Sequence, residues 1–297
     1  MSNMPAAEWE IDETLVWELL AAQVPELADR PLAMLANGWD NVMYRLGADL
    51  TVRLPRRKLA VPLIEHEQRC LELLGPQLPI PVPVPVHHGV PSERFPMPWS
   101  ICPWFPGVLA ADALFTDPIR EARRLGAFLT ALHVAAPDDA PRNEWRGQGA
   151  RVLAPRVAGN LVHIDLDGST TVELVTSRFA ALVDVDPLAG PPVWLHGDLH
   201  AANMLVDDGA ISAVIDFGDI TSGDPAVDLA IGWMLFEAEA LEEFRRALPH
   251  ADGATWSRGA AWALHFALMY LANSADNPRL NAMGRRLLPS VMSGELA

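Results

Sequence analysis

The sequence predicts an α+β protein with two unequal parts, a small N-terminal part built around a β-sheet and a larger, mainly helical remainder. Between Trp39 and Leu54, strand-like apolar pieces flank turn-forming residues, as expected of paired strands. Apolar residues at helical spacing dominate the later part of the chain. Half of the 297 residues are apolar, which is enough to bury a substantial core.

The first expected elements are a helix and a hairpin. Apolar residues between Ile11 and Leu27 follow helical spacing and predict an amphipathic helix. The segment from Trp39 to Leu54 contains the pieces VMYRLG and LTVRL around Gly47-Ala48-Asp49, which predicts a short hairpin.

A second helix is expected after Pro62, and it carries a carboxylate on its apolar stripe. Cys70 and Leu74 share this stripe with Glu67. Because burying an unpaired charge is costly, Glu67 needs a positive partner, and Arg53 on the preceding strand is our candidate. In the alternative, the helix is rotated and Glu67 lies in solvent.

An extended connector and a link separate the two parts. The tract Pro79–Val86 alternates Pro with Ile or Val, and Pro fits neither a helix interior nor a central strand. Another strand is expected near Trp99–Cys102, and the piece FPMPWSICPWFPG then enters a Pro-Gly turn. We place the boundary near Trp104, which gives lobes of residues 1–103 and 104–297.

The larger part is expected to consist mostly of helices. They cover Pro118–His133, the region around Thr171–Val183, and the chain from Asp224 onward, with Asp224 as N-cap and Pro225 in the first turn. The longest apolar run, Ala260–Ala272, is too short to span a bilayer and predicts a buried core helix.

Charge and cysteine content narrow the partners and the setting. The 22 Lys and Arg against 38 Asp and Glu leave a formal charge of -16, which repels nucleic acid and anionic membranes and attracts cationic small molecules. In the alternative, this charge serves solubility alone. The only cysteines are Cys70 and Cys102, and the acidic N-terminus has no apolar stretch before a cleavage site. We therefore expect a reduced, cytoplasmic protein with neither a signal peptide nor a disulfide framework.

The segment Trp194–Asp224 combines strand-like apolar pieces with a dense set of polar residues. It reads WLHGDLHAANMLVDDGAISAVIDFGDITSGD, and the Asp-Gly pair between apolar runs is a strong hairpin signal. A two-residue turn there brings Asn203, before the hairpin, and Asp216, after it, within reach of one metal ion. Asp198 lies in the preceding loop, where it can face the same cavity. Two oxygen ligands completed by phosphate oxygens and water suit Mg²⁺.

Six residues of this segment stand in the order and spacing of the catalytic and metal-binding signatures of protein kinases. They are His196, Asp198, Asn203, Asp216, Phe217 and Gly218. In that chemistry one Asp orients the acceptor hydroxyl and takes its proton, while the Asn and the second Asp hold metal across the phosphates. The pattern predicts Mg²⁺-dependent transfer of a terminal phosphoryl group from a nucleoside triphosphate to a hydroxyl of a small molecule.

The same motifs make the chain resemble the aminoglycoside phosphotransferase family. The family hallmark appears here as HGDLHAAN followed by IDFGD, and weaker similarity extends over most of the chain. The resemblance implies a protein-kinase-like two-lobed fold, with a small N-terminal β-sheet lobe and a larger, mainly helical C-terminal lobe. It also implies ATP or GTP as phosphoryl donor, Asp198 as catalytic base, and Asn203 and Asp216 as metal ligands.

The resemblance also implies a nucleotide site in the N-terminal lobe. Arg53 stands where the family has a lysine that touches the α- and β-phosphates, and Glu67 belongs to the helix that faces it. Gly38 lets the backbone approach a phosphate, although the full glycine-rich pattern is lacking. The hinge residues expected to offer backbone groups to the purine are Ser100, Ile101 and Cys102.

The acceptor stays open at this stage. The resemblance favours an aminoglycoside or a related antibiotic, and the negative charge suits a polycation. The alternatives are a macrolide or a metabolite such as choline, homoserine or a sugar, because one fold hosts many functions. A nucleotide-binding pseudokinase is a further alternative, motivated by Arg53 in place of lysine.

Three residues in or near the motif receive supporting roles, and one further histidine receives none. We interpret His200 as a structural hydrogen-bonding residue, since Zn²⁺ would need further His or Cys ligands. Asp219 is a candidate support for the metal site. Asp228 is expected to complete hydrogen bonds at a helix start, and His133 to be an ordinary residue.

Overall fold

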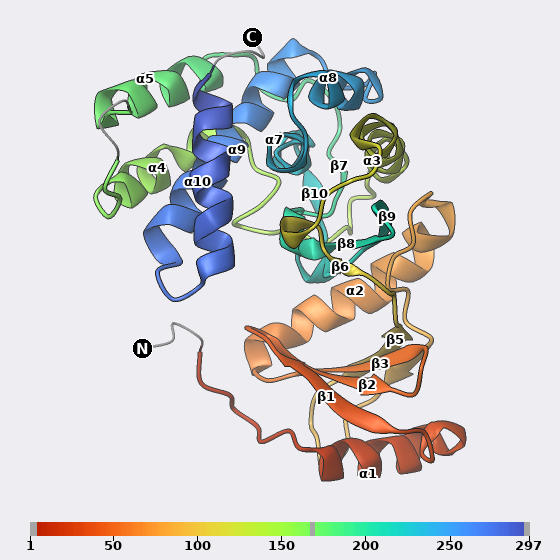
Figure 1. Ribbon diagram of the computed structural model, residues 1–297. Helices are drawn as coiled ribbons and strands as arrows, with labels where there is room; N and C mark the ends of the chain where they lie inside the picture. The colour runs from red at the N-terminus through yellow and green to blue at the C-terminus, as the bar shows by residue number, and fades with distance from the viewer. Residues whose placement is uncertain (1–4, 167–169, 294–297) are drawn as a thin grey trace. The chain divides into compact units, whose positions relative to one another are not determined.

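The computed structural model describes residues 5–166 and 170–293 and divides the chain into two compact units (Figure 1). The first unit comprises Met1–Pro106 and Ala213–Gly218, and the second comprises Gly107–Ser212 and Asp219–Ala297. The predicted α+β class is confirmed, with the large sheet in the first unit and most helices in the second. The boundary expected near Trp104 stays a prediction.

A five-stranded sheet organises the first unit, with the strand order β1-β2-β3-β5-β4 and antiparallel pairing throughout. Its elements are α1 (Glu13–Gln23), β1 (Leu32–Asn37), β2 (Asn41–Leu46), β3 (Leu50–Pro55), α2 (Val61–Leu74), β4 (His87–Gly89) and β5 (Trp99–Pro103). The predicted hairpin is β2 with β3, and Gly47 in its turn has a φ of +61°, a conformation that glycine adopts without strain.

The two faces of this sheet differ because side chains alternate along each strand. Val42, Val52 and Ile101 lie in the apolar core that also contains the buried side of α1. The intervening positions, such as Arg53 and Ser100, point to the opposite face. There α2 contacts β5, and Gln68 Nε2 donates to Ser100 Oγ at 3.0 Å.

The second unit contains the hairpin that the Asp-Gly pair predicted, apart from Ala213 and Val214 at the end of its second strand, which belong to the first unit. Its strands are β6 (Val108–Leu109), β8 (Met204–Asp207) and β9 (Ala210–Val214) in the order β6-β8-β9, with the separate pair β7 (Val193–Leu195) and β10 (Thr221–Gly223). Asp208 and Gly209, between β8 and β9, have φ values of 48° and 71°. Positive φ at both central residues is what a tight two-residue hairpin turn requires, so this prediction is confirmed.

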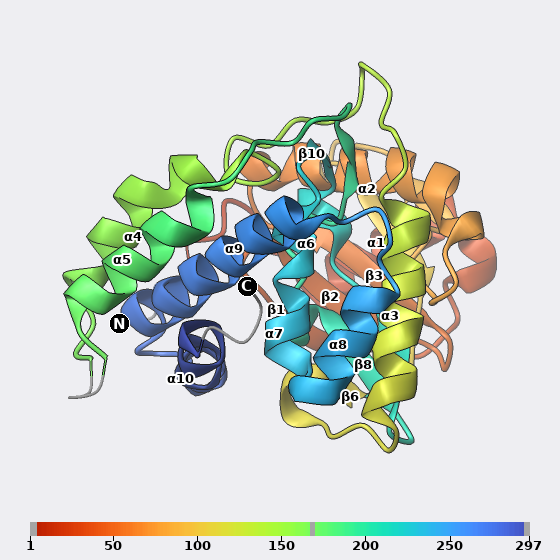
Figure 2. The same cartoon turned by 90° about the horizontal axis from the view of Figure 1, so that it is seen from above.

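Helices make up most of the second unit, and α9 lies at their centre. They are α3 (Pro118–Leu132), α4 (Ala154–Leu161), α5 (Val172–Val183), α6 (Ala226–Leu229), α7 (Ile231–Leu235), α8 (Ala238–Arg246), α9 (Gly253–Asn273) and α10 (Pro278–Met292). Figure 2 shows α9 lying between the α4–α5 pair and α10. The apolar run Ala260–Ala272 falls within α9, and its residues are mostly buried, as predicted. No helix of the described residues is long and apolar enough to cross a membrane.

One helix cap differs from its prediction. The N-cap of α6 is Pro225, so the prediction that Asp224 is the N-cap is wrong. Asp224 still accepts a hydrogen bond from the N–H of Ala226, but its carboxylate is mainly engaged by Arg258, whose Nε lies 2.6 Å from Oδ2. The Asp224 carboxylate therefore mainly forms a buried ion pair with Arg258 on α9, a helix far along the chain, instead of capping α6.

Candidate active site

Arg53 binds three polar side chains on the polar face of the first unit. Its Nη1 donates to Glu67 Oε2 at 2.5 Å, and its Nη2 donates to Asp216 Oδ1 at 2.6 Å. With its amide oxygen turned toward Arg53, Asn41 accepts from Nη2 and Nε at 3.0 and 3.1 Å. Glu67 is buried and paired with Arg53, so the predicted partner is confirmed and the alternative of a solvated Glu67 is excluded.

Burial and charge act in opposite directions on this cluster. Burial raises the pKa of Glu67 to about 7, although Arg53 opposes the shift. Burial lowers the pKa of Arg53, but the carboxylates of Glu67 and Asp216 outweigh it and raise that pKa. Burial also raises the pKa of the Cys102 thiol, which stays neutral. Arg53 therefore stays a guanidinium cation, and its planar fork of donors suits a polyphosphate.

Asp216 has an unusual backbone. It follows β9 by two residues, its φ is 63°, and its side chain is 53% exposed. A left-handed conformation at a non-glycine residue costs on the order of 1 kcal/mol and is often found where function requires it. Oδ1 is held by Arg53, and no donor among the described residues is bonded to Oδ2.

The other expected nucleotide contacts lie in the turn between β1 and β2 and on β5, an inner strand of the first unit's sheet. Gly38 is in the exposed turn between β1 and β2, where its carbonyl accepts from Arg56 Nη1 at 2.7 Å. The expected hinge residues are within β5, and they are Ser100, Ile101 and Cys102. The Ile101 carbonyl accepts from the N–H of Val86, so part of the backbone of β5 is used within the unit. Purine contact by these residues stays a prediction.

In the second unit, Asp198 lies in the loop between β7 and β8, as predicted. Its Oδ1 accepts from Arg146 Nη2 at 2.8 Å, and His200 Nε2 lies 3.5 Å from Oδ2. His200 Nδ1 accepts from the N–H of Ala202, which leaves the ring proton on Nε2 toward Asp198 and confirms a hydrogen-bonding role. Burial raises the pKa of Asp198, but Arg146 and His200 outweigh it and hold the pKa of this carboxyl well below its usual range.

Asp228 anchors the start of this loop. Its carboxylate is fully buried on α6 and accepts from the backbone N–H groups of His196 and Gly197, both at 2.9 Å. The expectation that Asp228 serves a helix start is therefore wrong. His133, expected to be ordinary, is buried against the same carboxylate. Both corrections arise because residues distant in sequence are brought to the loop by folding.

Asn203 closes the loop and offers an oxygen. The side chain is buried one residue before β8, and Nδ2 donates to the Asp198 carbonyl at 3.0 Å, so the amide oxygen remains as an acceptor. No group of three His, Cys, Asp or Glu side chains in residues 5–166 and 170–293 could hold a metal ion. Mg²⁺ does not need such a group, because it keeps several waters and binds through one or two protein oxygens plus phosphates. The amide oxygen of Asn203 and the carboxylate oxygens of Asp216 are each of the hard type that this ion binds.

Sequence reasoning did not find Arg146, and it gave Asp219 only a general role. Asp219 Oδ1 accepts from Asn143 Nδ2 at 2.6 Å, so it binds the same segment that carries Arg146. No motif or spacing links this segment to Asp198. In the sequence, Arg146 and Asp198 are two charged residues 52 positions apart, and no pattern connects them.

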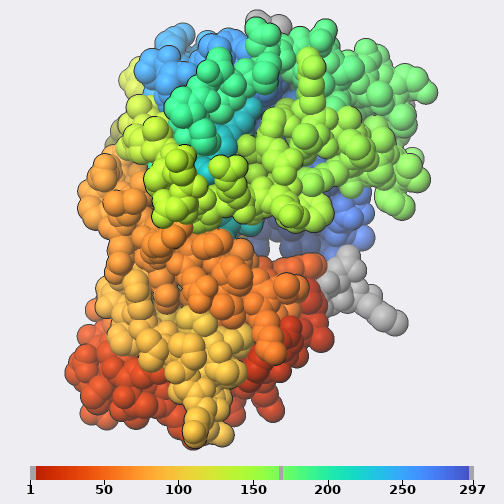
Figure 3. Space-filling model, turned by 180° about the vertical axis from the view of Figure 1, so that it is seen from behind, coloured from red at the N-terminus to blue at the C-terminus, as the bar shows by residue number. Residues whose placement is uncertain are grey.

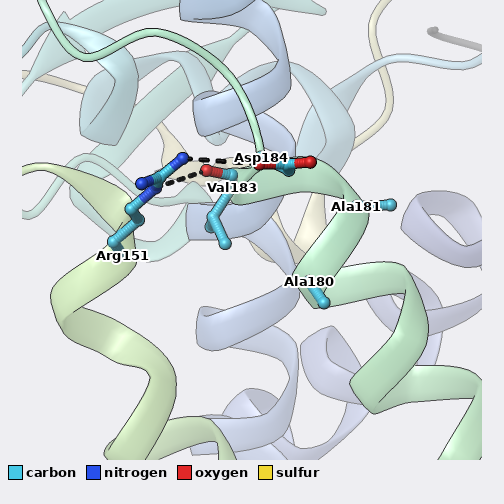
Figure 4. A pocket seen from close by; sticks show the side chains of 5 residues that line it. All are labelled: Arg151, Ala180, Ala181, Val183 and Asp184. Carbon is cyan, nitrogen blue, oxygen red and sulfur yellow. Dashed lines mark hydrogen bonds and ion pairs between the residues drawn. The ribbon is translucent and has the colours of Figure 1, made fainter.

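A surface hollow of about 460 Å³ lies elsewhere in the second unit (Figure 4). Arg151 bridges its rim by donating to the Val183 carbonyl at 2.8 Å and lying 3.5 Å from Asp184. None of the candidate site residues lines this hollow, so it is not part of the candidate active site.

Sequence comparison identifies relatives with a named activity. A viomycin phosphotransferase of Streptomyces vinaceus is 29% identical over 254 residues, which cover 79% of this chain and 85% of the relative. An aminoglycoside 3'-phosphotransferase of Escherichia coli is 27% identical over 125 residues, 42% of this chain and 44% of that relative.

Solved structures of phosphotransferases share the fold. The GDP complex of wild-type aminoglycoside 2'-phosphotransferase-IIIa matches with a TM-score of 0.67 at 17% identity, over 95% of this chain and 99% of that one. A macrolide 2'-phosphotransferase of Brachybacterium faecium matches with a TM-score of 0.59 at 21% identity, over 92% and 98%. The predicted protein-kinase-like, two-lobed α+β fold is thereby confirmed. The model of the phosphotransferase enzyme family matches residues 32–262, most of the sequence, and the chain belongs to that family.

Proposed function

We propose that this phosphotransferase moves the terminal phosphoryl group of ATP or GTP onto a hydroxyl of a small antibiotic molecule, with Asp198 as the base. The proposal depends on Asp198, whose ionised carboxylate is 24% exposed and therefore accessible to a substrate. Arg146 holds its Oδ1, and Asn203 holds its carbonyl. Such a carboxylate can accept a hydrogen bond from an alcohol and take its proton.

The phosphoryl transfer needs no reactant besides the nucleoside triphosphate and the acceptor alcohol. The acceptor oxygen forms a bond to the terminal phosphorus, and the bond from that phosphorus to the bridging oxygen breaks. The electron pair of the broken bond leaves on the nucleoside diphosphate, and the hydroxyl proton goes to Asp198.

The proposal assigns nucleotide binding to the lobe of residues 1–103 and acceptor binding to residues 104–297. Arg53, positioned by Glu67, is the candidate for the phosphates, because its fork of donors matches phosphate oxygens. Gly38 is a candidate for close backbone approach to a phosphate. The hinge candidates for the purine are Ser100, Ile101 and Cys102. Fold neighbours solved with GDP and with ATP support a nucleotide as donor.

Asn203 and Asp216 are the residues that would hold Mg²⁺. When bound, the ion neutralises negative charge on the phosphates. Arg53 holds Asp216 Oδ1 in place, and Asn203 is held by its bond to the Asp198 carbonyl. These contacts orient the two oxygens before any ligand arrives.

The names of the relatives support an antibiotic as acceptor. They include phosphotransferases of viomycin and of aminoglycosides, and one neighbour was solved with GDP and kanamycin. The formal charge of -16 suits cationic acceptors of this kind. A small hydroxylated cation is therefore the first class of acceptor to test.

The test is a nucleotide-consumption assay with Mg²⁺, ATP or GTP, and a panel of viomycin, kanamycin, a macrolide, choline and homoserine. We expect acceptor-dependent turnover, and phosphorus NMR should detect the phosphorylated product. Asp198→Asn should lower kcat by about 10²- to 10⁴-fold, the usual contribution of a general base. Asp208→Asn makes the same chemical change in an exposed turn and should leave turnover intact. Nucleotide binding without turnover of any acceptor would favour the pseudokinase alternative.

A further inference from the structure

The segment between α3 and α4 is firmly attached around Arg146. In Figure 3 this segment, in yellow-green, lies at the surface of the second unit beside the green residues that follow it in the chain. The Pro141 carbonyl accepts from Thr221 Oγ1 and from the N–H of Ser222, at 3.0 and 3.1 Å, and the Gly147 carbonyl accepts from the N–H of Asp224 at 2.8 Å. Hydrogen bonds on both sides of Arg146 therefore attach the segment, at Pro141 to β10 and at Gly147 to Asp224, the residue after β10.

Gly147 brings the backbone of this segment close to the small sheet. Its φ is +70°, and a Cβ atom there would lie 2.8 Å from Leu195 Cδ1. Gly223 also lies close to this backbone, since a Cβ atom there would lie 2.1 Å from the Gly147 carbonyl oxygen. The two glycines allow a contact that other residues would block, so the position of Arg146 is set by the backbone as well as by its own side chain.

The guanidinium of Arg146 is directed at Asp198. Its side chain is only 15% exposed, Nη2 bonds Oδ1 of Asp198, and its central carbon lies 5.4 Å from the centre of the buried Phe266 ring. Its Nε–H is buried and has no acceptor among the described residues. A buried donor without a partner destabilises a fold, so fold stability alone is a poor reason for this arrangement.

The two oxygens of Asp198 are held unequally. Arg146 makes a charge-assisted bond of 2.8 Å to Oδ1, while His200 Nε2 lies 3.5 Å from Oδ2. An acceptor hydroxyl therefore meets less competition at Oδ2. A carboxylate fixed at one oxygen cannot rotate freely, so the direction of the other oxygen is also determined.

We propose that Arg146 is a positioning residue for the phosphoryl transfer, which holds Asp198 by Oδ1 and so directs Oδ2 toward the acceptor hydroxyl. This inference rests on the proposed role of Asp198 as base. Arg146 takes no proton in the step; the hydroxyl proton still goes to Asp198, and the phosphoryl group still passes from the nucleotide to the acceptor oxygen. Its effect is to keep the base in one orientation, and misplacement of a reacting group by about 1 Å can lower the rate by about 10²-fold.

Three variants separate this role from a structural one. Arg146→Ala removes the guanidinium, and Arg146→Lys keeps a charge but offers a single point donor instead of a planar fork. Arg156→Ala is the matched control, because Arg156 lies on α4 with its guanidinium 4.3 Å from the Trp145 ring centre and is not bonded to Asp198. Thermal unfolding is measured for all three so that loss of fold is detected.

The assay uses the acceptor panel above and also records slow transfer to water. For Arg146→Ala we expect kcat to fall about 10²-fold while the KM for nucleotide stays unchanged, with partial recovery in Arg146→Lys. Millimolar guanidinium ion should restore part of the activity of Arg146→Ala and none of that of Asp198→Asn. Arg156→Ala should match the wild-type enzyme.

The outcomes distinguish the two proposals. A wild-type enzyme that transfers phosphoryl groups neither to an acceptor nor to water would overturn the proposed function and this inference together. An active wild-type enzyme whose Arg146→Ala variant keeps or increases kcat would overturn only the inference. The same holds if Arg146→Ala loses activity, yet neither lysine nor guanidinium ion restores any of it.

Discussion

Nε2 of His133 lies 3.2 Å from Oδ2 of Asp228, and both side chains are completely buried. Nδ1 of the same histidine lies 3.2 Å from Nε2 of His250, which is exposed. Because Asp228 also accepts from the N–H groups of His196 and Gly197, a continuous set of contacts runs from the surface to the residue before the proposed base. The carboxylate of Asp228 on α6 therefore joins the end of α3 to the loop between β7 and β8.

Asp228→Asn should both destabilise the protein and slow the reaction. The amide presents a donor where two backbone N–H groups need acceptors, and disrupting a buried charged network costs about 3 kcal/mol or more. Urea unfolding measures the loss, and kcat should fall with it because the loop before Asp198 loses its anchor. Asp208→Asn is the matched control in an exposed turn. Equal unfolding midpoints for the two variants would refute this role of Asp228.

Arg53→Lys should weaken nucleotide binding although it restores the residue type that the family uses. A lysine cannot donate to both Glu67 and Asp216 with the planar fork that Arg53 uses. We expect the Kd for GDP and ADP, measured by calorimetry, to rise by about tenfold, the equivalent of 1.4 kcal/mol. Arg57→Lys, which changes a second arginine paired with Asp40, is the control. Tighter binding by Arg53→Lys would contradict the prediction.

Asp216→Asn should preserve the fold and impair the response to Mg²⁺. Asn tolerates the positive φ of 63° at this position, so the backbone can stay as it is. The amide is a weaker ligand for a hard cation than a carboxylate. We expect the Mg²⁺ concentration for half-maximal activity to rise by about tenfold or more, with an unfolding midpoint close to that of the wild type. An unchanged Mg²⁺ titration would remove Asp216 from the set of metal ligands.

Gly147→Ala should act through Arg146. The left-handed φ and the 2.8 Å approach of a Cβ atom to Leu195 predict a loss of about 1–3 kcal/mol and a shift of the neighbouring guanidinium. Gly149→Ala is the control, because a Cβ atom there meets nothing within 4 Å and the φ is not left-handed. Chemical unfolding and kcat are both measured. Wild-type values of both in Gly147→Ala would show that the segment adapts without strain.

His265 should make the protein sensitive to acid. Burial, with the nearby charges of Arg146 and Arg156, lowers the pKa of this histidine to about 4, from an unperturbed 6.5. The folded state favours the neutral ring, so this contribution to stability is complete above pH 6.5 and is lost as the pH falls toward 4. The wild type should lose roughly 3 kcal/mol more than His265→Gln over this range.

The readout for His265 is the free energy of unfolding measured at several pH values. His163→Gln, at an exposed position, is the control and should keep the wild-type pH dependence. Parallel curves for the wild type and His265→Gln would show that His265 does not titrate as its burial implies.

Much of the fold followed from local patterns. The helix that became α3 and the β8–β9 hairpin were predicted from apolar spacing and an Asp-Gly turn, which depend on neighbouring residues. The pairing of Arg53 with Glu67 was also predictable, because a carboxylate on an apolar stripe needs a cation and the preceding strand offered one. The cap of α6 was missed because Arg258 competes for Asp224.

By itself, the sequence indicated the family, the two-part α+β fold and the candidate residues Asp198, Asn203 and Asp216, since motif spacing and periodicity are carried by the chain locally. Tertiary structure alone decided what holds Asp198. Arg146 is 52 residues away along the chain, and His133 is 95 residues from Asp228. No spacing encodes such contacts, because they exist only once burial has brought separate segments together and each buried charge has found its partner.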